Sequence, residues 1–183
     1  MQQPVPSVHR APKKNLALLL IDLQKAHLHE FSYEHGPVEE GLRRIVAVIA
    51  EARALCIPVL LVSGEREPDL LHEISDAARG ARIFTKKTAS AFGAPGLDAF
   101  LDDLRVDTLV LSGWERRICV RETVLDALGE GYGIMTSDQI IFGKAPSSAP
   151  MLSEVERRGF QDQLRIYPTS DDLIRAIRKE CQK

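Results

Sequence analysis

Short apolar runs with almost no polar interruption recur along this chain, and they limit the folds that it can adopt. Six segments have this character or a weaker form of it: NLALLLID (15–22), IPVLLVSG (57–64), RIF (82–84), DTLVLSG (107–113), YGIMTSD (132–138) and QLRIYPT (163–169). A run that does not alternate between apolar and polar residues is typical of a strand that is buried on both faces of a sheet. We therefore predict a strand in each of these segments.

Segments with helical features separate the strands. Helices are predicted over residues 38–56, 69–79, 95–106, 117–132, 147–158 and 170–180. The apolar stripe of the first consists of Leu42, Ile45, Val46, Ile49, Ala50 and Ala54. Ser170 or Asp171 is expected to cap the last helix. Strands that alternate with helices predict an α/β fold, in which helices cover both faces of a parallel sheet.

The domain organisation follows from the same pattern. No internal repeat or linker interrupts it, so we expect one domain over residues 15–183. Residues 1–14 are polar and broken by prolines, and they are expected to form a flexible arm. They lack the apolar stretch of a secretory signal.

Charge and cysteine usage exclude several classes of protein. The formal net charge is −2, which favours neither nucleic acid nor an anionic membrane as a partner. The longest apolar runs are too short to cross a bilayer. The three cysteines Cys56, Cys119 and Cys181 are widely spaced and form no CxxC pair, so neither a disulfide framework nor a zinc site is indicated. We expect a cytoplasmic protein.

Three chemically reactive side chains lie at or beyond the carboxyl ends of predicted strands. Asp22 ends the first strand, Lys86 follows the short third strand, and Cys119 follows the strand at 107–113 and opens the next helix. In open parallel sheets, ligands bind beyond the carboxyl ends of the strands, where the strand order reverses. We expect the three side chains to converge there within hydrogen-bonding or ion-pair distance.

These residue types suit acyl transfer to a cysteine. A helix N-terminus and a nearby lysine would lower the pKa of the Cys119 thiol, a carboxylate could accept its proton, and backbone amides could hold an oxyanion. Each residue also has an ordinary structural interpretation: a small core cysteine, a turn-forming aspartate, and a solvated lysine of a KK pair. Spacing alone leaves both interpretations open.

Three segments resemble motifs of one known family. LLLIDLQ resembles a first strand with a catalytic aspartate, matched by Asp22. KKTASAF resembles K-x-x-x-S-A-F, which selects Lys86 rather than Lys87. LVLSGWERRICVRETVLDALGEGY resembles G-x-x-x-x-x-C-V-x-x-T-x-x-D-A-x-x-x-G-Y, with Cys119 as the nucleophile. The family is the isochorismatase-like cysteine hydrolases, which include nicotinamidases, N-carbamoylsarcosine amidases and isochorismatases.

The resemblance implies a fold and a reaction. The fold would be a Rossmann-like three-layer sandwich with a six-stranded, mostly parallel sheet. The reaction would be the metal-independent hydrolysis of a small amide or ureido compound without a cofactor. Asp22 would take the thiol proton, and Cys119 would attack the carbonyl carbon to form a thioester, with Lys86 as the third catalytic residue. Family members are usually oligomeric, so a homodimer or homotetramer is expected.

The resemblance also implies an oxyanion hole. The family has a non-proline cis peptide beside this hole, and the matching bond here joins Trp114 to Glu115. We therefore expect Trp114, Glu115 and Ile118 to form or flank the oxyanion hole.

The chain departs from the family pattern at possible metal ligands. Nicotinamidases carry a D-x-H metal motif followed by a further histidine, whereas the segment SGEREPDLLHE has no such motif. His72 within it is expected on a helix surface, and His27 and His29, two residues apart, are a weak ligand signal. We therefore expect no bound metal.

Other departures fall around the expected substrate pocket. Arg116 stands where many members have threonine, Trp114 where a smaller aliphatic residue is usual, and His27 where phenylalanine is common. All three are candidate pocket residues; for Trp114, stacking on a planar ligand and plain core packing both stay open. The arginines of this region could bind a substrate carboxylate or pair with nearby acids; they are Arg116, Arg117 and Arg121, with Glu115, Glu122 and Asp126 as the acids.

Two functions remain open on the sequence. The first is a cysteine amidohydrolase acting on a small-molecule substrate. The second is a catalytically altered member that binds a small ligand or a protein partner. A lowered pKa of the Cys119 thiol would favour the enzyme. We expect Cys56 to be buried and unreactive, and Cys181 to be exposed with an ordinary thiol pKa.

Overall fold

In the computed structural model, which describes residues 15–30, 38–64, 69–143 and 149–182, all six predicted strands form. They are β1 (Leu16–Ile21), β2 (Val59–Ser63), β3 (Arg82–Thr85), β4 (Thr108–Gly113), β5 (Gly133–Ser137) and β6 (Leu164–Tyr167). They pair into one sheet in the order β3-β2-β1-β4-β5-β6, and every pairing is parallel. The predicted α/β class and parallel sheet are confirmed.

The strand order reverses between β1 and β4. The chain builds β1, β2 and β3 toward one edge of the sheet, then returns to place β4 on the other side of β1. Gly113 ends β4 and permits the two strands to lie close at this point. A Cβ at Gly113 would lie 2.1 Å from the Ile21 carbonyl oxygen, and its φ of +144° is unfavourable for other residues. The carboxyl ends of β1 and β4 therefore frame the place where such sheets bind ligands.

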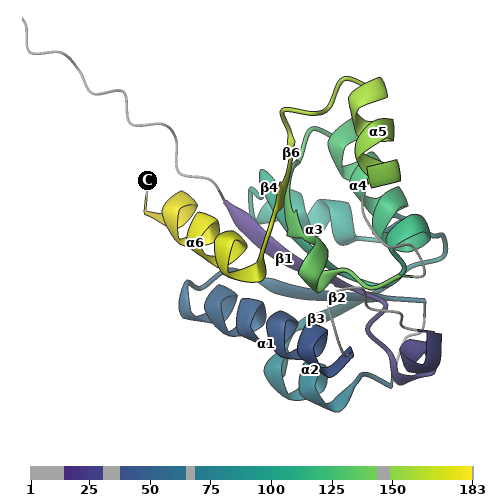
Figure 1. Cartoon of the computed structure of the whole chain (residues 1–183), viewed down its shortest axis with the longest axis vertical. Coiled ribbons are helices and arrows are strands. Elements are labelled where there is room, and N and C mark those ends of the chain that lie inside the picture. The colour runs from purple at the N-terminus through teal and green to yellow at the C-terminus, as the bar shows by residue number, and fades with distance from the viewer. Residues whose placement is uncertain (1–14, 31–37, 65–68, 144–148, 183) are drawn as a thin grey trace, which may run out of the picture.

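Helices cover both faces of the sheet (Figure 1). Helices α1 (Val38–Ala54), α2 (His72–Ala77) and α6 (Ser170–Cys181) contribute to one apolar cluster, and α3 (Leu97–Asp103), α4 (Arg121–Gly129) and α5 (Ala149–Arg157) contribute to the other. None of the helices in the described residues is both long enough and apolar enough to cross a membrane. The predicted arm, residues 1–14, lies outside the described residues.

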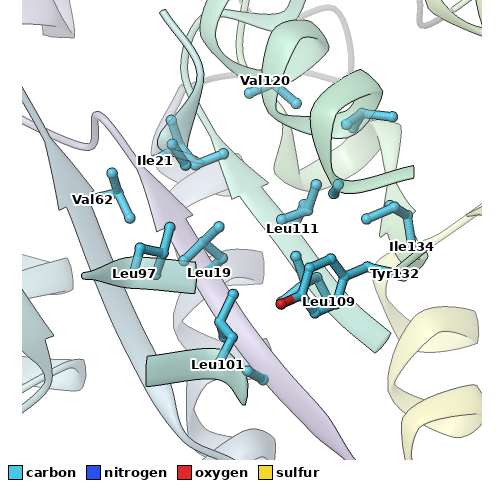
Figure 2. Close-up of a cluster of buried hydrophobic side chains, with 14 of the residues drawn as sticks. Leu19, Ile21, Val62, Leu97, Leu101, Leu109, Leu111, Val120, Tyr132 and Ile134 are labelled. Atoms are coloured by element: carbon cyan, nitrogen blue, oxygen red, sulfur yellow. The ribbon is translucent and has the colours of Figure 1, made fainter. Parts of the chain in front are cut away.

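Strand β1 supplies both clusters because its side chains alternate between the faces of the sheet. Leu19 and Ile21 pack with α3 and α4, whereas Leu18 and Leu20 pack with α1 and α6. Figure 2 shows the first cluster, where Leu97 and Leu101 lie against the strands. Full burial of one such side chain stabilises the fold by about 1.5–3 kcal/mol, so this doubly buried strand is the centre of the core.

Details within the predicted helices differ from the expectations. The buried stripe of α1 includes Val48 and Ala52, whereas Ala50 and Ala54 are exposed, so the predicted stripe had the wrong phase on its C-terminal side. The side chain of Thr169, not of Ser170 or Asp171, caps α6 by accepting from the Asp172 amide at 3.1 Å.

Candidate active site

Asp22 lies directly after β1, at the reversal of strand order. Its backbone has a φ of 51°, which is uncommon for a residue other than glycine but better tolerated by aspartate. Its amide donates to the Val62 carbonyl of β2 at 3.0 Å. The residue is only 5% exposed, so its carboxylate needs partners within the protein.

Lys86 supplies that partner. It follows β3, and its amide donates to the Ser63 carbonyl at the end of β2. Its ammonium contacts Asp22 Oδ2 at 2.8 Å, Cys119 Sγ at 3.1 Å and the Ala89 carbonyl at 2.9 Å. An ammonium has three protons, and each has an acceptor here. Lys86 is thus a buried, paired charge rather than a surface lysine.

Cys119 lies in a π-helical turn, η3 (Arg116–Val120), that leads into α4. Val120 is buried in the cluster of Figure 2 and anchors this turn to the core. The Thr123 hydroxyl donates to the Cys119 carbonyl at 2.7 Å and accepts from the Ala91 amide at 2.9 Å. These contacts hold the half-buried thiol opposite Lys86 and Asp22, as the sequence predicts.

The surroundings of the thiol favour its neutral form. Burial raises the pKa of Cys119 above its ordinary value, and the hydrogen bond to the Asp22 carboxylate raises it further. The Lys86 ammonium acts in the opposite direction but does not prevail. The predicted lowering of this pKa is therefore wrong. The prediction relied on the helix N-terminus and the lysine, whereas burial and the carboxylate dominate in the folded chain.

The peptide bond between Trp114 and Glu115 is cis, at the position that the resemblance implies. The Glu115 carbonyl accepts from the amides of Ile118 at 3.1 Å and Val120 at 3.0 Å, and its side chain accepts from the Arg117 amide at 3.1 Å. Because the Ile118 N–H is already bonded, it would reach an oxyanion only by leaving the Glu115 carbonyl. The place of Trp114, Glu115 and Ile118 in an oxyanion hole stays a prediction.

A cavity of about 650 Å³ opens beside Asp22 and Lys86, a volume suited to a small molecule. Its lining consists of Asp22, Gln24, His27, Gly64, Thr85, Lys86, Lys87 and Thr88. His27 stacks on the buried Trp114 with 6.2 Å between ring centroids. The structure thus places His27 at this cavity, with Trp114 packed against it.

Arg116 is not among the described residues that line this cavity. It is 3% exposed, and its guanidinium donates to Asp138 Oδ1 at 3.2 Å and to the carbonyls of Asp138 at 3.2 Å and Ile141 at 2.6 Å. Its amide donates to the Phe142 carbonyl at 2.9 Å. Arg116 therefore joins the turn before α4 to the chain after β5. This geometry does not support the predicted pocket role, because the guanidinium is engaged by a segment distant in sequence.

Candidate metal ligands do not gather in the part of the chain that the structure describes. No three histidine, cysteine, aspartate or glutamate side chains come together there. His72 lies on the surface of α2 beside Asp76, with 3.4 Å between Nε2 and Oδ2. The side chain of His29 is outside the described part. The expected absence of bound metal stays a prediction.

The other two thiols differ from their expectations. Cys56 is exposed, not buried, because it lies in the turn after α1 with a φ of 56°. Cys181 is partly buried at the end of α6 rather than fully exposed. Both line a small cavity at the amino ends of the strands, remote from Cys119.

The protein is therefore of the α/β class. Its candidate site consists of a cysteine in contact with a lysine that is paired with an aspartate, where the strand order reverses. Residues 16–138 match the family model described as the isochorismatase domain. The chain belongs to the isochorismatase family, as the resemblance indicates.

One relative is similar to this chain in sequence over a short segment, and other proteins are similar to it in fold. An N-carbamoylsarcosine amidase of an Arthrobacter species is 36% identical over 69 residues, which are 38% of this chain and 26% of that protein. An isochorismatase-like hydrolase from Alkaliphilus metalliredigens superposes with a TM-score of 0.69 at 21% identity, covering 88% of this chain and 98% of that one. N-carbamoylsarcosine amidase from Thermoplasma acidophilum superposes with a TM-score of 0.66 at 22% sequence identity, covering 86% of this chain and 97% of that one. The two structural likenesses concern the fold alone.

Gln24 is a cavity residue that was not singled out from the sequence. Gln24 is 3% exposed, and its Oε1 has no hydrogen-bond partner among the described residues. Its position two residues after Asp22 in the segment DLQ was the only sequence signal. A pattern of residue types does not reveal whether a buried amide is satisfied.

Proposed function

We propose that this protein is a cysteine hydrolase that cleaves a C–N bond of a small amide or ureido compound without a metal or another cofactor. The observation that carries the proposal is the buried ammonium of Lys86, which contacts both the Asp22 carboxylate and the Cys119 sulfur. The family of the chain and the amidase among its relatives support the same reaction class.

The reaction begins with transfer of the thiol proton from Cys119 to the Asp22 carboxylate. The resulting thiolate, beside the Lys86 ammonium, attacks the carbonyl carbon of the substrate. The tetrahedral intermediate expels the nitrogen group, which receives the proton from Asp22 and leaves as ammonia or an amine. Water then attacks the thioester with Asp22 as base, releases the acid product and restores the thiol. A positioned general base typically accelerates such a step about 10²- to 10⁴-fold.

The raised thiol pKa is compatible with this sequence of steps. A free thiolate is not needed at rest, because the acceptor of the proton is already hydrogen-bonded to the thiol. Lys86 has two effects: it holds the Asp22 carboxylate in place, and it stabilises the negative charge when this moves from oxygen to sulfur. Buried, paired groups of this kind need little reorganisation as the charge moves.

Ammonia release from three probes tests the proposal: acetamide, benzamide and N-carbamoylsarcosine. The wild-type protein should release ammonia from at least one probe. Cys119→Ala and Asp22→Asn should lower kcat for that probe by about 100-fold or more, because each removes a partner of the proton transfer. Cys56→Ala is the matched control, since it removes an exposed cysteine at the other end of the strands.

The raised thiol pKa also favours a second candidate, a family member that binds a ligand without turning it over. Under that function, none of the probes releases ammonia, yet a ligand that enters the cavity still slows alkylation of Cys119. Activity that survives in Cys119→Ala would contradict both functions.

A further inference from the structure

Among the described residues that line the cavity beside Asp22 and Lys86, Gln24 is the only one with a side-chain amide. Gln24 is almost wholly buried, yet its Oε1 has no hydrogen-bond donor in the described part of the chain. Burying an amide oxygen without a donor costs about 1–3 kcal/mol. Gln24 Oε1 is itself covered, but the residue lines the cavity, so a turn of the carboxamide would let a ligand there supply the missing donor.

The backbone holds Gln24 in place. It forms an isolated antiparallel bridge with Leu70, and hydrogen bonds flank it on both sides. The Lys25 amide donates to the Asp69 carbonyl at 2.8 Å, and the Leu71 amide donates to the Leu23 carbonyl at 3.2 Å. The side chain is therefore presented from a fixed backbone, which lowers the entropy cost of binding through it.

We propose that Gln24 is a specificity-determining residue: its carboxamide turns toward the cavity when a ligand binds and its Oε1 then accepts an N–H of the substrate, so that the cavity selects compounds with an N–H next to the scissile carbonyl. The proposal rests on the proposed function for the identity of the scissile bond. It narrows the substrate class to primary and secondary amides and ureido compounds, and it disfavours esters of the same acids.

The chemistry of a carboxamide fits this role. Its oxygen is an acceptor with two lone pairs, and an amide substrate brings the N–H that the cavity wall lacks. An ester of the same shape keeps the carbonyl but offers no donor, so Oε1 would stay without a partner when an ester is bound. Sites that leave a buried polar group without its partner discriminate strongly against the analogue that lacks it.

Binding to protein that cannot turn over separates this proposal from the proposed function. In a Cys119→Ala background, the dissociation constants of benzamide and methyl benzoate are measured by NMR titration, with and without Gln24→Met. Benzamide should bind more tightly than methyl benzoate, and Gln24→Met should weaken benzamide by about 3- to 10-fold, the loss of one hydrogen bond. Methyl benzoate should change less than twofold, by the same argument.

Gln163→Met is the matched control. The Oε1 of Gln163 also lacks a hydrogen-bond partner, but this residue lies before β6 and is not in the cavity lining. The control should leave both dissociation constants unchanged.

The outcomes are distinct. Equal weakening of both ligands by Gln24→Met, no weakening of benzamide, or no binding of either ligand overturns the role of Gln24. If Gln24→Met fails to fold, the preference of the Cys119→Ala protein for benzamide over methyl benzoate decides instead. If benzamide binding depends on Gln24 but the wild type turns over no probe, the role of Gln24 in recognition stands and the hydrolase function is rejected. If the wild type turns over a probe but binding does not depend on Gln24, the hydrolase function stands and the role of Gln24 is rejected.

Discussion

The candidate nucleophile is a protonated thiol held between a base and a cation. Burial and the Asp22 carboxylate raise the pKa of Cys119, whereas the Lys86 ammonium lowers it by a smaller amount. The resting site is therefore poised for proton transfer rather than for storage of a thiolate. Removing either neighbour should move the thiol pKa, and the two removals should move it in opposite directions.

Iodoacetamide labelling across pH tests this arrangement. The midpoint for Cys119 should lie above the ~8.5 of an ordinary thiol, fall in Asp22→Asn and rise in Lys86→Met. Peptide-resolved mass spectrometry gives the rate at each pH, and the exposed Cys56 serves as the internal control. A Cys119 midpoint well below ~8.5 in the wild-type protein would show that the charge balance is the reverse of the one described.

At the scale of the elements, the junction of β1 and β4 has little tolerance for change. Gly113 approaches the backbone of Ile21, and the Trp114 amide donates to the Ile21 carbonyl at 2.9 Å. Asp22 and the turn that carries Cys119 continue directly from these two strands. A shift of either strand end would therefore separate the groups of the candidate site.

Gly113→Ala should destabilise the fold by roughly 3 kcal/mol or more, because the new Cβ meets backbone atoms and the φ is unfavourable. Urea denaturation followed by circular dichroism measures this loss. Gly129→Ala is the control: a Cβ there meets no atom within 4 Å, and alanine at this helical position should be neutral or stabilising. Similar unfolding midpoints for both variants would show that the close approach to Ile21 is not limiting.

The sequence predicts the elements well because uninterrupted apolar runs and helical stripes are local patterns. All six strands, and the positions of Asp22, Lys86 and Cys119 at their ends, follow from such patterns. Features that depend on distant partners were missed. The partner of Arg116 lies after β5, and the lack of a donor for Gln24 is visible only once its neighbours surround it. The predicted direction of the Cys119 pKa shift was wrong for the same reason, since burial is a property of the assembled fold.

At the scale of the whole molecule, the Cys119 thiol links folding to alkaline pH. Its pKa is raised in the folded state, so the unfolded chain loses this proton first as the pH increases. The stability that the neutral thiol contributes is fully present below the unfolded pKa of ~8.5 and is lost as the pH rises through the folded pKa.

The free energy of unfolding should therefore fall between pH 8 and pH 10 more steeply in the wild type than in Cys119→Ala. One proton can contribute at most about 1.4 kcal/mol per pH unit. Urea titrations at a series of pH values measure the difference, and Cys56→Ala, which removes an exposed thiol, should keep the wild-type slope. Parallel curves for the wild type and Cys119→Ala would contradict the raised pKa.

The reversal of strand order has a consequence for how the protein is made. β1 is synthesised first, yet it needs β4, which is synthesised fourth, to cover its second edge. Until β4 leaves the ribosome, the apolar segment Leu16–Ile21 can pair only with β2 and keeps one edge open to other chains. The second edge of β1 therefore stays open until residues 86–113 have been translated. Asp22 and Cys119 meet only when that edge closes, so assembly of the candidate site and protection of the most apolar strand are the same event.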